Sequence, residues 1–562
     1  MSGPPPRFTR RAALGGAALA GAGTLLSPAA GLAAGLQRSR VFSHWVGRVD
    51  GVSIVLTAAR PFALAGVQWS GPPTARIELR TRRLGAPWGP WALASVTGHD
   101  SGPGPGSTGA AKSFGEPIWV DAADQVQLRA APGVSGVRVH FVVTPASSPA
   151  HRSARPSAAA AAALPLAQPV LPAGPGQPPI IARAAWARGQ APSAGSARYG
   201  SVRLAFVHHT ENPNGYSATQ VAPMLLAIFD YHRYVRGFFD IAYNFLIDAF
   251  GRIWEGRAGG IDAPVIGAHA GGYNLESTGV AVLGTFISSV PPPRALAALE
   301  QLLAWKLALH GVPARGRVRV QVDPLGAVYT PYRPGARVLL PRVAGHRDGD
   351  QTDCPGDAFY HRLPAVRRQV AALATTPARL TIATPTLTVA PGATVALTGR
   401  LARLDTHAPL AGASVEIHAL AADSATTIAT ALTAADGTWS ATVTVSRDVL
   451  VRALHAEAPA AVSGVIAVGV APLLTLSLVA GSPPRVTGTV APPKPRLILD
   501  VYEQAGPHRR LRASQRIVVH RGIFSARPAL GVPRGRRYVL IARTAAGGGT
   551  LAGASAPLSL TY

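Results

Sequence analysis

The stretch Val202-Arg-Leu-Ala-Phe-Val-His-His-Thr210 decides the fold of this chain. Its apolar run predicts a strand that ends at a pair of histidines, and a segment with helical periodicity follows over residues 217–235. The same alternation continues downstream, with strands predicted over 244–248, 252–255 and 279–286, and helices over 292–310 and 363–374. Strands that alternate with helices predict one α/β domain, over residues 179–375.

The sequence ahead of this domain has a different pattern. Residues 38–144 contain short alternating strands between Gly and Pro turns, such as Gly136-Val-Arg-Val-His-Phe-Val-Val143, which predicts a β-sandwich. We expect Trp88 and Trp91 in the core of that sandwich. Residues 145–178 are rich in Ala, Pro and Ser without periodicity, which is typical of an extended linker.

The sequence after the α/β domain returns to strand patterning and repeats. Gly437-Thr-Trp-Ser440 recurs as Gly522-Ile-Phe-Ser525, at a spacing that fits one immunoglobulin-like sandwich. We therefore expect two such domains, over residues 376–470 and 471–562. The predicted fold class is multidomain, with a central α/β domain flanked by β-sandwiches.

The first 36 residues predict an export signal. Arg10 and Arg11 precede an uncharged run from Ala12, and small residues near Ala30 to Ala34 resemble a cleavage site. An arginine pair ahead of such a run is typical of the bacterial twin-arginine route, which carries folded proteins. The alternative is an uncleaved membrane anchor, but the run is poor in Leu, Ile and Phe. We expect a secreted or cell-wall protein with no stable membrane span after cleavage.

The composition indicates folded domains with a basic surface. The chain has 562 residues, 48% of them hydrophobic, with 54 basic and 27 acidic side chains and a formal net charge of +27. Such a surface attracts polyanions, although a genomic preference for arginine would give the same excess. The arginine clusters lie in strand-like sequence without interleaved aromatic platforms, which argues against nucleic acid as a partner. Anionic cell-wall polymers are the partners that this charge favours.

The only cysteine of the chain, Cys354, marks the candidate reactive centre. It follows His346 in the polar stretch Gly345-His-Arg-Asp-Gly-Asp-Gln-Thr-Asp-Cys354. Taken alone, each residue has an ordinary interpretation, as a buried thiol or a loop histidine. Together, a thiolate and imidazoles form a good donor set for zinc, and three protein ligands leave a fourth position open. The third ligand is His208 or His209, because neighbours on a strand point to opposite faces.

Seven motifs occur in order within residues 179–375: Ile180-Ile-Ala-Arg-Ala-Ala-Trp186, Phe206-Val-His-His-Thr210, Asp240-Ile-Ala-Tyr-Asn-Phe-Leu-Ile247, Trp254-Glu-Gly-Arg257, Gly267-Ala-His-Ala270, Ser277-Thr-Gly-Val280, and Gly345-His-Arg-Asp348 through Thr352-Asp-Cys-Pro-Gly356. This series resembles the zinc N-acetylmuramoyl-L-alanine amidases of the type-2 amidase and peptidoglycan recognition protein group. The resemblance implies a mixed sheet with flanking helices and one Zn²⁺ per chain. It also implies hydrolysis of the amide between the lactyl group of N-acetylmuramic acid and L-alanine in peptidoglycan.

The resemblance also assigns roles to individual residues of this chain. It implies that His208, His346 and Cys354 hold the zinc and that Tyr243 assists catalysis. A phenol there could hold a water molecule or the developing oxyanion. Thr352 stands where phage-type relatives carry lysine and recognition-protein relatives carry threonine, and we include it among the catalytic candidates.

A second group of residues is expected around the substrate rather than at the metal. His209, His269 and Asn274 are predicted to line the substrate groove. His209 could instead orient one of the metal-binding side chains or the turn at Thr210. Glu255 is expected to be structural rather than a second proton acceptor. Relatives that prefer diaminopimelate stems often show Gly-Trp before Asp-Ile, whereas this chain has Gly237-Phe-Phe-Asp240, so the sequence assigns no stem-peptide preference.

Three other functions fit parts of the same pattern. A non-catalytic protein that recognises muropeptides would usually lack the thiolate ligand, and Cys354 is present. A cysteine hydrolase built on Cys354 and His346 would need a lowered thiol pKa, and the Asp-Cys-Pro-Gly surroundings predict no helix N-terminus to lower it. A blue-copper carrier would need a methionine near the thiolate, and the chain has only Met1 and Met224.

Overall fold

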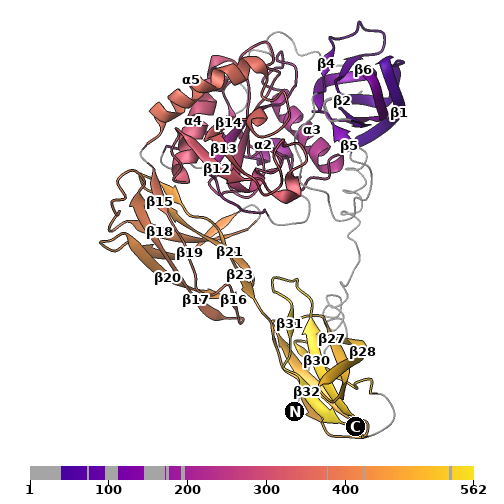
Figure 1. Ribbon diagram of the computed structural model, residues 1–562, viewed down its shortest axis with the longest axis vertical. Helices are drawn as coiled ribbons and strands as arrows, with labels where there is room; N and C mark the ends of the chain where they lie inside the picture. Colours follow the sequence, from indigo (N-terminus) through magenta and orange to yellow (C-terminus); the bar gives the residue numbers. More distant parts are fainter. Residues whose placement is uncertain are drawn as a thin grey trace, which may run out of the picture.

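The computed structural model describes residues 40–71, 75–94, 112–144, 171, 176–190, 197–375, 377–421, 424–530 and 535–562. The predicted export signal and most of the predicted linker lie outside these residues. In the part of the chain so described, no helix combines the length and apolar character that crossing a bilayer requires. Figure 1 shows four folded regions, with the N-terminal domain beside the α/β domain and the two C-terminal β domains extending away from them.

The α/β domain contains one six-stranded mixed sheet. Its order is β14 (Val343–Gly345), β8 (Leu204–His209), β11 (Ser277–Val282), β9 (Phe245–Ile247), β10 (Ile253–Glu255) and β7 (Ile180–Ile181). Only the β9–β10 pair is antiparallel in this sheet. A separate hairpin is formed by β12 (Arg317–Gln321) and β13 (Arg337–Pro341). The expected mixed sheet is therefore confirmed.

Helices cover both faces of this sheet. α4 (Pro293–Leu309) and α5 (Asp357–Leu373) share a buried apolar cluster with Phe245 and Ile247 of β9. α3 (Val221–Tyr234) and the short α2 (Ala184–Ala187) share another cluster with Leu246, on the opposite face. This alternation follows from the period of two in a strand. The result is a three-layer helix–sheet–helix domain, with α3 on the side that faces the N-terminal domain (Figure 1).

The last helix of this domain begins earlier than predicted. α5 starts at Asp357, whereas the prediction placed its start at Leu363. Gly356 precedes it with φ +90, a conformation that suits glycine, and the Asp357 carboxylate favours the positive end of the helix dipole. Pro364 lies inside the helix and removes one backbone hydrogen bond without ending it. In contrast, α3 begins later than predicted, at Val221 rather than at residue 217.

The N-terminal domain is one curled sheet rather than the predicted pair of sheets. Its order is β4-β3-β6-β2-β5, with β1 paired to β6. The strands are β1 (Val41–Val52), β2 (Leu56–Ser70), β3 (Ile77–Arg82), β4 (Ala92–Leu93), β5 (Lys112–Phe114) and β6 (Ile118–Val142). Because β6 is 25 residues long and bends, Leu64 of β2 pairs with both Trp119 and Val142. This closes the sheet around a single apolar core.

The tryptophans expected in that core lie at its surface. Trp88 and Trp91 are both half-buried, and the Arg80 guanidinium lies over both rings, 4.9 and 4.5 Å from their centroids. Arg82 covers Trp88 and Arg129 covers Trp91 from neighbouring positions. The prediction was wrong because the arginines of β3 and β6 provide cation–π partners that keep these rings on the outer face.

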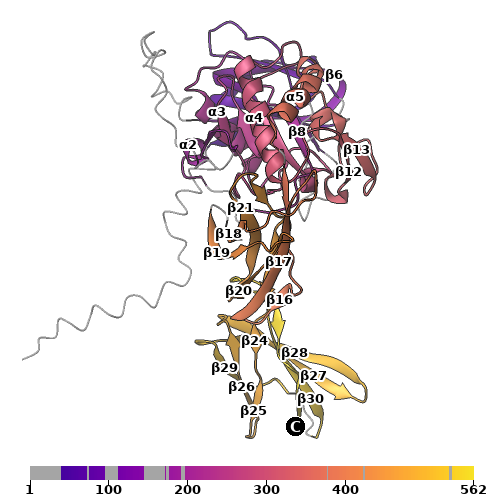
Figure 2. The same ribbon diagram turned by 90° about the vertical axis from the view of Figure 1, so that its left-hand side faces the viewer.

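Two double-sheet β domains follow the α/β domain (Figures 1 and 2). The first contains β15 (Ala378–Leu380), β16 (Thr388–Val389), β17 (Ala393–Arg403), β18 (Ser414–Leu420), β19 (Ala425–Leu432), β20 (Thr438–Val445), β21 (Val449–His455), β22 (Ala461–Val462) and β23 (Ile466–Val470). The second contains β24 (Leu473–Leu474), β25 (Ser477–Val479), β26 (Arg485–Ala491), β27 (Arg496–Ala505), β28 (His508–Val518), β29 (Ile523–Ala526), β30 (Arg537–Thr544), β31 (Gly553–Ala554) and β32 (Leu558–Thr561). Each domain has its own apolar core.

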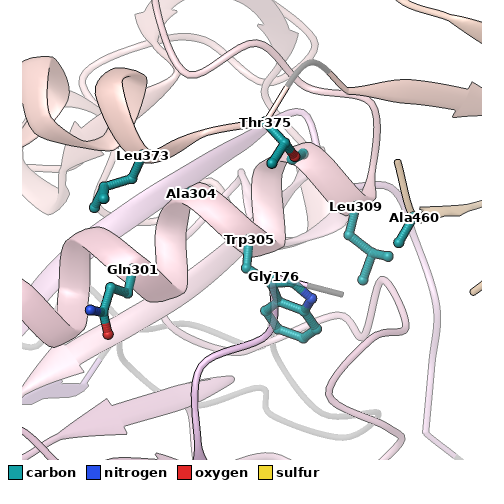
Figure 3. A pocket seen from close by; sticks show the side chains of 9 residues that line it. Gly176, Gln301, Ala304, Trp305, Leu309, Leu373, Thr375 and Ala460 are labelled. Atoms are coloured by element: carbon teal, nitrogen blue, oxygen red, sulfur yellow. The ribbon is translucent and has the colours of Figure 1, made fainter. Parts of the chain in front are cut away.

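The first of these β domains packs against the α/β domain. Arg452 of β21 donates a hydrogen bond to Asp262 over 2.6 Å. A small cavity of about 170 Å³ lies in the same seam, lined by Trp305 and Leu309 of α4 and by Ala460 (Figure 3). No charged side chain lines this cavity in the part of the structure that is described, so it carries no obvious chemistry.

Candidate metal centre

Two neighbouring strands of the central sheet direct histidines to the same edge. β14 pairs with β8 in parallel, and Gly345 lies opposite Val207. His208 follows Val207 on β8, and His346 is the first residue after β14, so the two side chains emerge side by side at the carboxyl ends. Parallel strands present their carboxyl ends at one edge of a sheet, where functional side chains of α/β domains gather. The short helix η5 (His346–Asp348) then turns the chain toward Cys354.

The three predicted ligands meet at this edge. One donor atom from each of His208, His346 and Cys354 lies within 4.8 Å of the others. Cys354 Sγ is 3.6 Å from His208 Nδ1, and the two imidazole centroids are 4.4 Å apart. The histidines are 0% exposed and the cysteine 5%. Residues that are separated by 138 and 8 positions in the sequence therefore form one buried cluster.

Further polar groups fix the orientation of these side chains. His208 Nε2 lies 3.2 Å from Nδ1 of His269, and His346 Nε2 lies 3.1 Å from Oδ2 of Asp350. The backbone N–H of His209 donates to Cys354 Sγ over 3.4 Å. The hydrogen bonds at both Nε2 atoms leave Nδ1 as the ring nitrogen of each histidine that could bind an ion. Sequence analysis missed Asp350, although its position four residues after His346 could have identified it.

Tyr243, the predicted catalytic tyrosine, lies against the cluster. Its ring centroid is 5.4 Å from that of His208, and the side chain is 1% exposed. Burial raises the pKa of Tyr243 well above its usual value, and the nearby carboxylate of Glu116 adds to the increase. The phenol is therefore protonated at neutral pH, which suits a hydrogen-bond donor rather than a base.

Thr352 lies in the loop that carries the thiol. Its hydroxyl oxygen accepts a hydrogen bond from the backbone N–H of Cys354 over 3.2 Å. The side chain is half-buried, whereas its neighbour Asp353 is exposed. This contact gives Thr352 a role in shaping the Cys354 loop, beyond any contact with a substrate.

The residues predicted to line a substrate groove lie elsewhere. His269 is fully buried behind His208, where it supports the ring. Asn274 accepts hydrogen bonds from the backbone N–H groups of His269 and Ala270, so it holds the loop that carries His269. His209 is also buried, and its Nδ1 accepts from the backbone of Phe286 over 3.3 Å. These three side chains therefore support the centre from behind rather than forming an open groove.

Glu255 is structural, as expected. Its carboxylate accepts a hydrogen bond from the backbone N–H of Arg183 over 2.9 Å, and its carbonyl oxygen accepts from the Trp186 indole over 2.7 Å. These contacts connect β10 to α2 at the edge of the sheet.

The thiol of Cys354 is poorly suited to act as a nucleophile, but not for the reason that the sequence suggested. A helix does begin close by, since α5 starts at Asp357. Burial nevertheless raises the pKa of the Cys354 thiol well above its usual value, although the N–H of His209 opposes the increase. The metal-free protein therefore keeps a neutral thiol, whereas a cysteine nucleophile requires the thiolate.

Comparison with known proteins identifies two parts of the chain. A family model described as N-acetylmuramoyl-L-alanine amidase matches residues 198–357. A second model, described as Rv3811 N-terminal galactose-binding domain-like, matches residues 26–163. Together these matches cover the α/β centre and the curled β domain ahead of it.

Individual relatives resemble the α/β domain. Peptidoglycan recognition protein 1 of Mus musculus is 31% identical over 183 residues, which are 32% of this chain and 84% of that protein. The N-acetylmuramoyl-L-alanine amidase of Homo sapiens is 29% identical over 208 residues, which are 36% of this chain and 31% of the human protein. The solved structure of Drosophila PGRP-LB is 26% identical, covering 33% of this chain and 92% of that one, with a TM-score of 0.26.

The seven ordered motifs, the match to the amidase family model and the coverage of the mouse relative all concern the same part of the chain. On this basis the chain belongs to the type-2 amidase and peptidoglycan recognition protein family.

Proposed function

We propose that the protein is a secreted zinc-dependent N-acetylmuramoyl-L-alanine amidase that acts on peptidoglycan. The observation that carries this proposal is the convergence of two imidazoles and the chain's only thiol within 4.8 Å, at the strand ends of a domain of this family. Relatives named as amidases and as peptidoglycan recognition proteins support the substrate class.

The residues present fit a zinc ion. His208 and His346 would bind through Nδ1 and Cys354 through Sγ, which is a donor set that zinc prefers. The outer contacts to His269 and Asp350 are of the type that orients zinc-binding histidines. Zinc at such a site supplies activation of a water molecule and polarisation of a carbonyl group. Three protein ligands would leave a fourth position for that chemistry.

Tyr243 would act on the scissile amide itself. Its protonated hydroxyl is a hydrogen-bond donor in a buried setting, beside the ring of His208. A donor directed at the carbonyl oxygen stabilises negative charge as it develops there, and such contacts are strongest where water is excluded. Thr352 would keep the Cys354 loop in position through its hydrogen bond to the backbone.

The flanking domains would hold the enzyme at its polymer. The net charge of +27 favours contact with anionic wall polymers. We infer export by the twin-arginine route from Arg10 and Arg11 at the start of the chain. Removal of the two C-terminal β domains should then weaken adhesion to walls without changing turnover on soluble muropeptides. Unchanged adhesion would contradict this role.

The activity is tested on purified peptidoglycan with product analysis by mass spectrometry. The expected products are free stem peptides that begin with L-alanine and glycan strands that keep the lactyl group. Chelation should stop the release, and added zinc should restore it. A protein that binds zinc and peptidoglycan but releases no peptide would be a recognition protein. Loss of activity on thiol alkylation with resistance to chelators would indicate a cysteine hydrolase.

A further inference from the structure

The N-terminal domain is packed closely onto the amidase domain. Leu64 and Trp119 belong to the same buried cluster as Met224 and Tyr231 of α3. Gly66 of β2 lies directly against the Tyr231 ring, since a Cβ atom at Gly66 would be 2.3 Å from Cε2 of that ring. Because so close an approach excludes any larger side chain, the contact between β2 and α3 depends on this glycine.

A turn of the N-terminal domain extends from this contact toward the metal centre. The Arg236 guanidinium lies 4.6 Å from the ring centroid of Phe114, and the Tyr231 hydroxyl donates to the carbonyl oxygen of Gly115 over 3.3 Å. The backbone N–H of Trp119 donates to Oδ1 of Asn212 over 2.7 Å. Asn212 follows His208 by four residues. The turn over residues 114–119 therefore touches the loop that leaves the ligand strand.

Glu116, within this turn, is buried near the centre. Its side chain is nearly inaccessible to solvent. The pKa of Glu116 is raised, mainly by burial and then by Glu211. Electrostatic effects of this kind require the groups to be close in a poorly solvated region. The turn therefore lies against the loop that follows His208, which contains both Glu211 and Asn212.

The two domains make a second contact through Tyr329. Tyr329, from the connection between β12 and β13, packs into the core of the N-terminal domain. Its carbonyl oxygen accepts a hydrogen bond from the backbone N–H of Gln351 over 2.9 Å. Gln351 directly precedes Thr352 and lies three residues before Cys354. The N-terminal domain thus contacts the loop after His208 and, through Tyr329, the loop before Cys354.

The centre itself is closed to solvent. The three ligand side chains and Tyr243 are almost fully inaccessible to solvent, whereas peptidoglycan is a broad substrate of glycan and peptide. We propose that the N-terminal domain is a built-in cap on the amidase centre, which must lift from α3 before the substrate can enter. The proposal rests on the proposed function for the identity of the substrate. The closure of the centre does not depend on that identity.

The cap is tested with a substitution that separates the two domains. In Gly66→Leu, the new side chain would collide with Tyr231 and push β2 off α3. Ala59→Leu is the matched control, because Ala59 is exposed in the same strand. Phe114→Ala is a milder second variant, which removes the ring beneath Arg236 without adding volume. Thermal unfolding checks that all three proteins fold.

The first measurement is alkylation of Cys354 by a bulky maleimide in metal-free protein, because this thiol is the only one in the chain. Wild-type protein and Ala59→Leu should react slowly, whereas Gly66→Leu should react at least about tenfold faster, since a buried thiol reacts only through opening. Phe114→Ala should fall between them. Fast alkylation of the wild-type protein would overturn the cap proposal. Alkylation rates that are unchanged in both Gly66→Leu and Phe114→Ala would overturn it as well.

The second measurement is peptide release from intact peptidoglycan by the zinc-loaded proteins. Gly66→Leu should release peptides about fivefold faster than wild type or more, as expected when opening limits turnover. Slower release together with faster alkylation would overturn the cap, because the turn would then be required for catalysis. If alkylation behaves as predicted but no variant releases peptide, the proposed function fails and the closure stands.

Discussion

The metal centre of the central domain and the ion pairs of the last β domain bury polar side chains in different ways. In the last domain, buried Asp500 of β27 accepts from Ser514 over 2.5 Å and pairs with Arg543 of β30. Each carboxylate there meets an opposite charge or a hydroxyl on a neighbouring strand. In the metal centre, the donor atoms come from His208, His346 and Cys354. These three atoms face one another, and none of them belongs to a carboxylate.

The difference separates stabilising pairs from a reactive centre. In an ion pair such as Asp500–Arg543, each charge offsets part of the cost of desolvating the other, and no added ligand is required. Three buried donor atoms that face one another are stabilised by a cation bound between them, as in a metal-binding site. The following experiments test this contrast, in order of decreasing effect on activity.

Loss of the thiolate ligand should have the largest effect. Cys354→Ser should lower zinc content severely and reduce peptide release by about a thousandfold, equivalent to about 4 kcal/mol of transition-state stabilisation. Cys354→Asp should recover part of the bound zinc, because a carboxylate is also a zinc ligand. Metal analysis and peptide release are measured on the same samples. Full activity of Cys354→Ser would refute a role for the sulfur.

Removal of the Tyr243 hydroxyl should reduce turnover but not metal binding. Tyr243→Phe should lower kcat by about a hundredfold to a thousandfold, the range for loss of one oxyanion donor. Tyr273→Phe is the control, since its hydroxyl bonds to Thr330 and to the backbone of Gly349 behind the centre. It should keep near wild-type turnover. A change in zinc content in Tyr243→Phe would show that the residue supports the metal instead.

The carboxylate behind His346 should affect metal affinity more than turnover. Asp350→Asn should weaken zinc binding by about 10-fold to 100-fold, as is usual for a partner of a metal-bound histidine. Competition with a chelating dye measures this affinity. Asp353→Asn, at an exposed position in the same loop, should leave it unchanged. Equal losses of zinc affinity in the two variants would show that the affinity depends on the total negative charge of the loop and not on the contact with His346.

A core substitution in a β domain should leave catalysis intact. Trp439 of β20 is buried in the first β domain, and Trp439→Ala should destabilise that domain by about 3–5 kcal/mol. Calorimetry should show its unfolding at a lower temperature, while turnover on soluble muropeptides stays the same. A parallel loss of turnover would show that the centre depends on the β domain.

The sequence predicted the parts of the centre that depend on residue type. His208, His346 and Cys354 could be assigned because few residues bind zinc and because their motifs resemble a known family. The α/β class was predictable because buried strands alternate with helical segments, whereas the mixed sheet was expected from the family resemblance. The start of α5 was missed because the cue is a glycine with positive φ at Gly356, which a sequence does not reveal.

Contacts between distant segments could not be predicted. Nothing local to Glu116 indicates that it is buried beside the amidase centre, because its neighbours there lie in another domain. The buried position of His269 was missed for the same reason, since it depends on the packing of its loop behind β8. A periodic pattern reports which face of an element is apolar, but not which distant element covers it.

The most direct test of the account is zinc X-ray absorption of the purified full-length protein. We expect one zinc per chain, bound by one sulfur at about 2.3 Å and by two imidazole nitrogens at about 2.0–2.1 Å. The sulfur should disappear from the zinc shell in Cys354→Ser. A zinc shell without sulfur in the wild-type protein, or a protein that binds no zinc at all, would contradict the central claim.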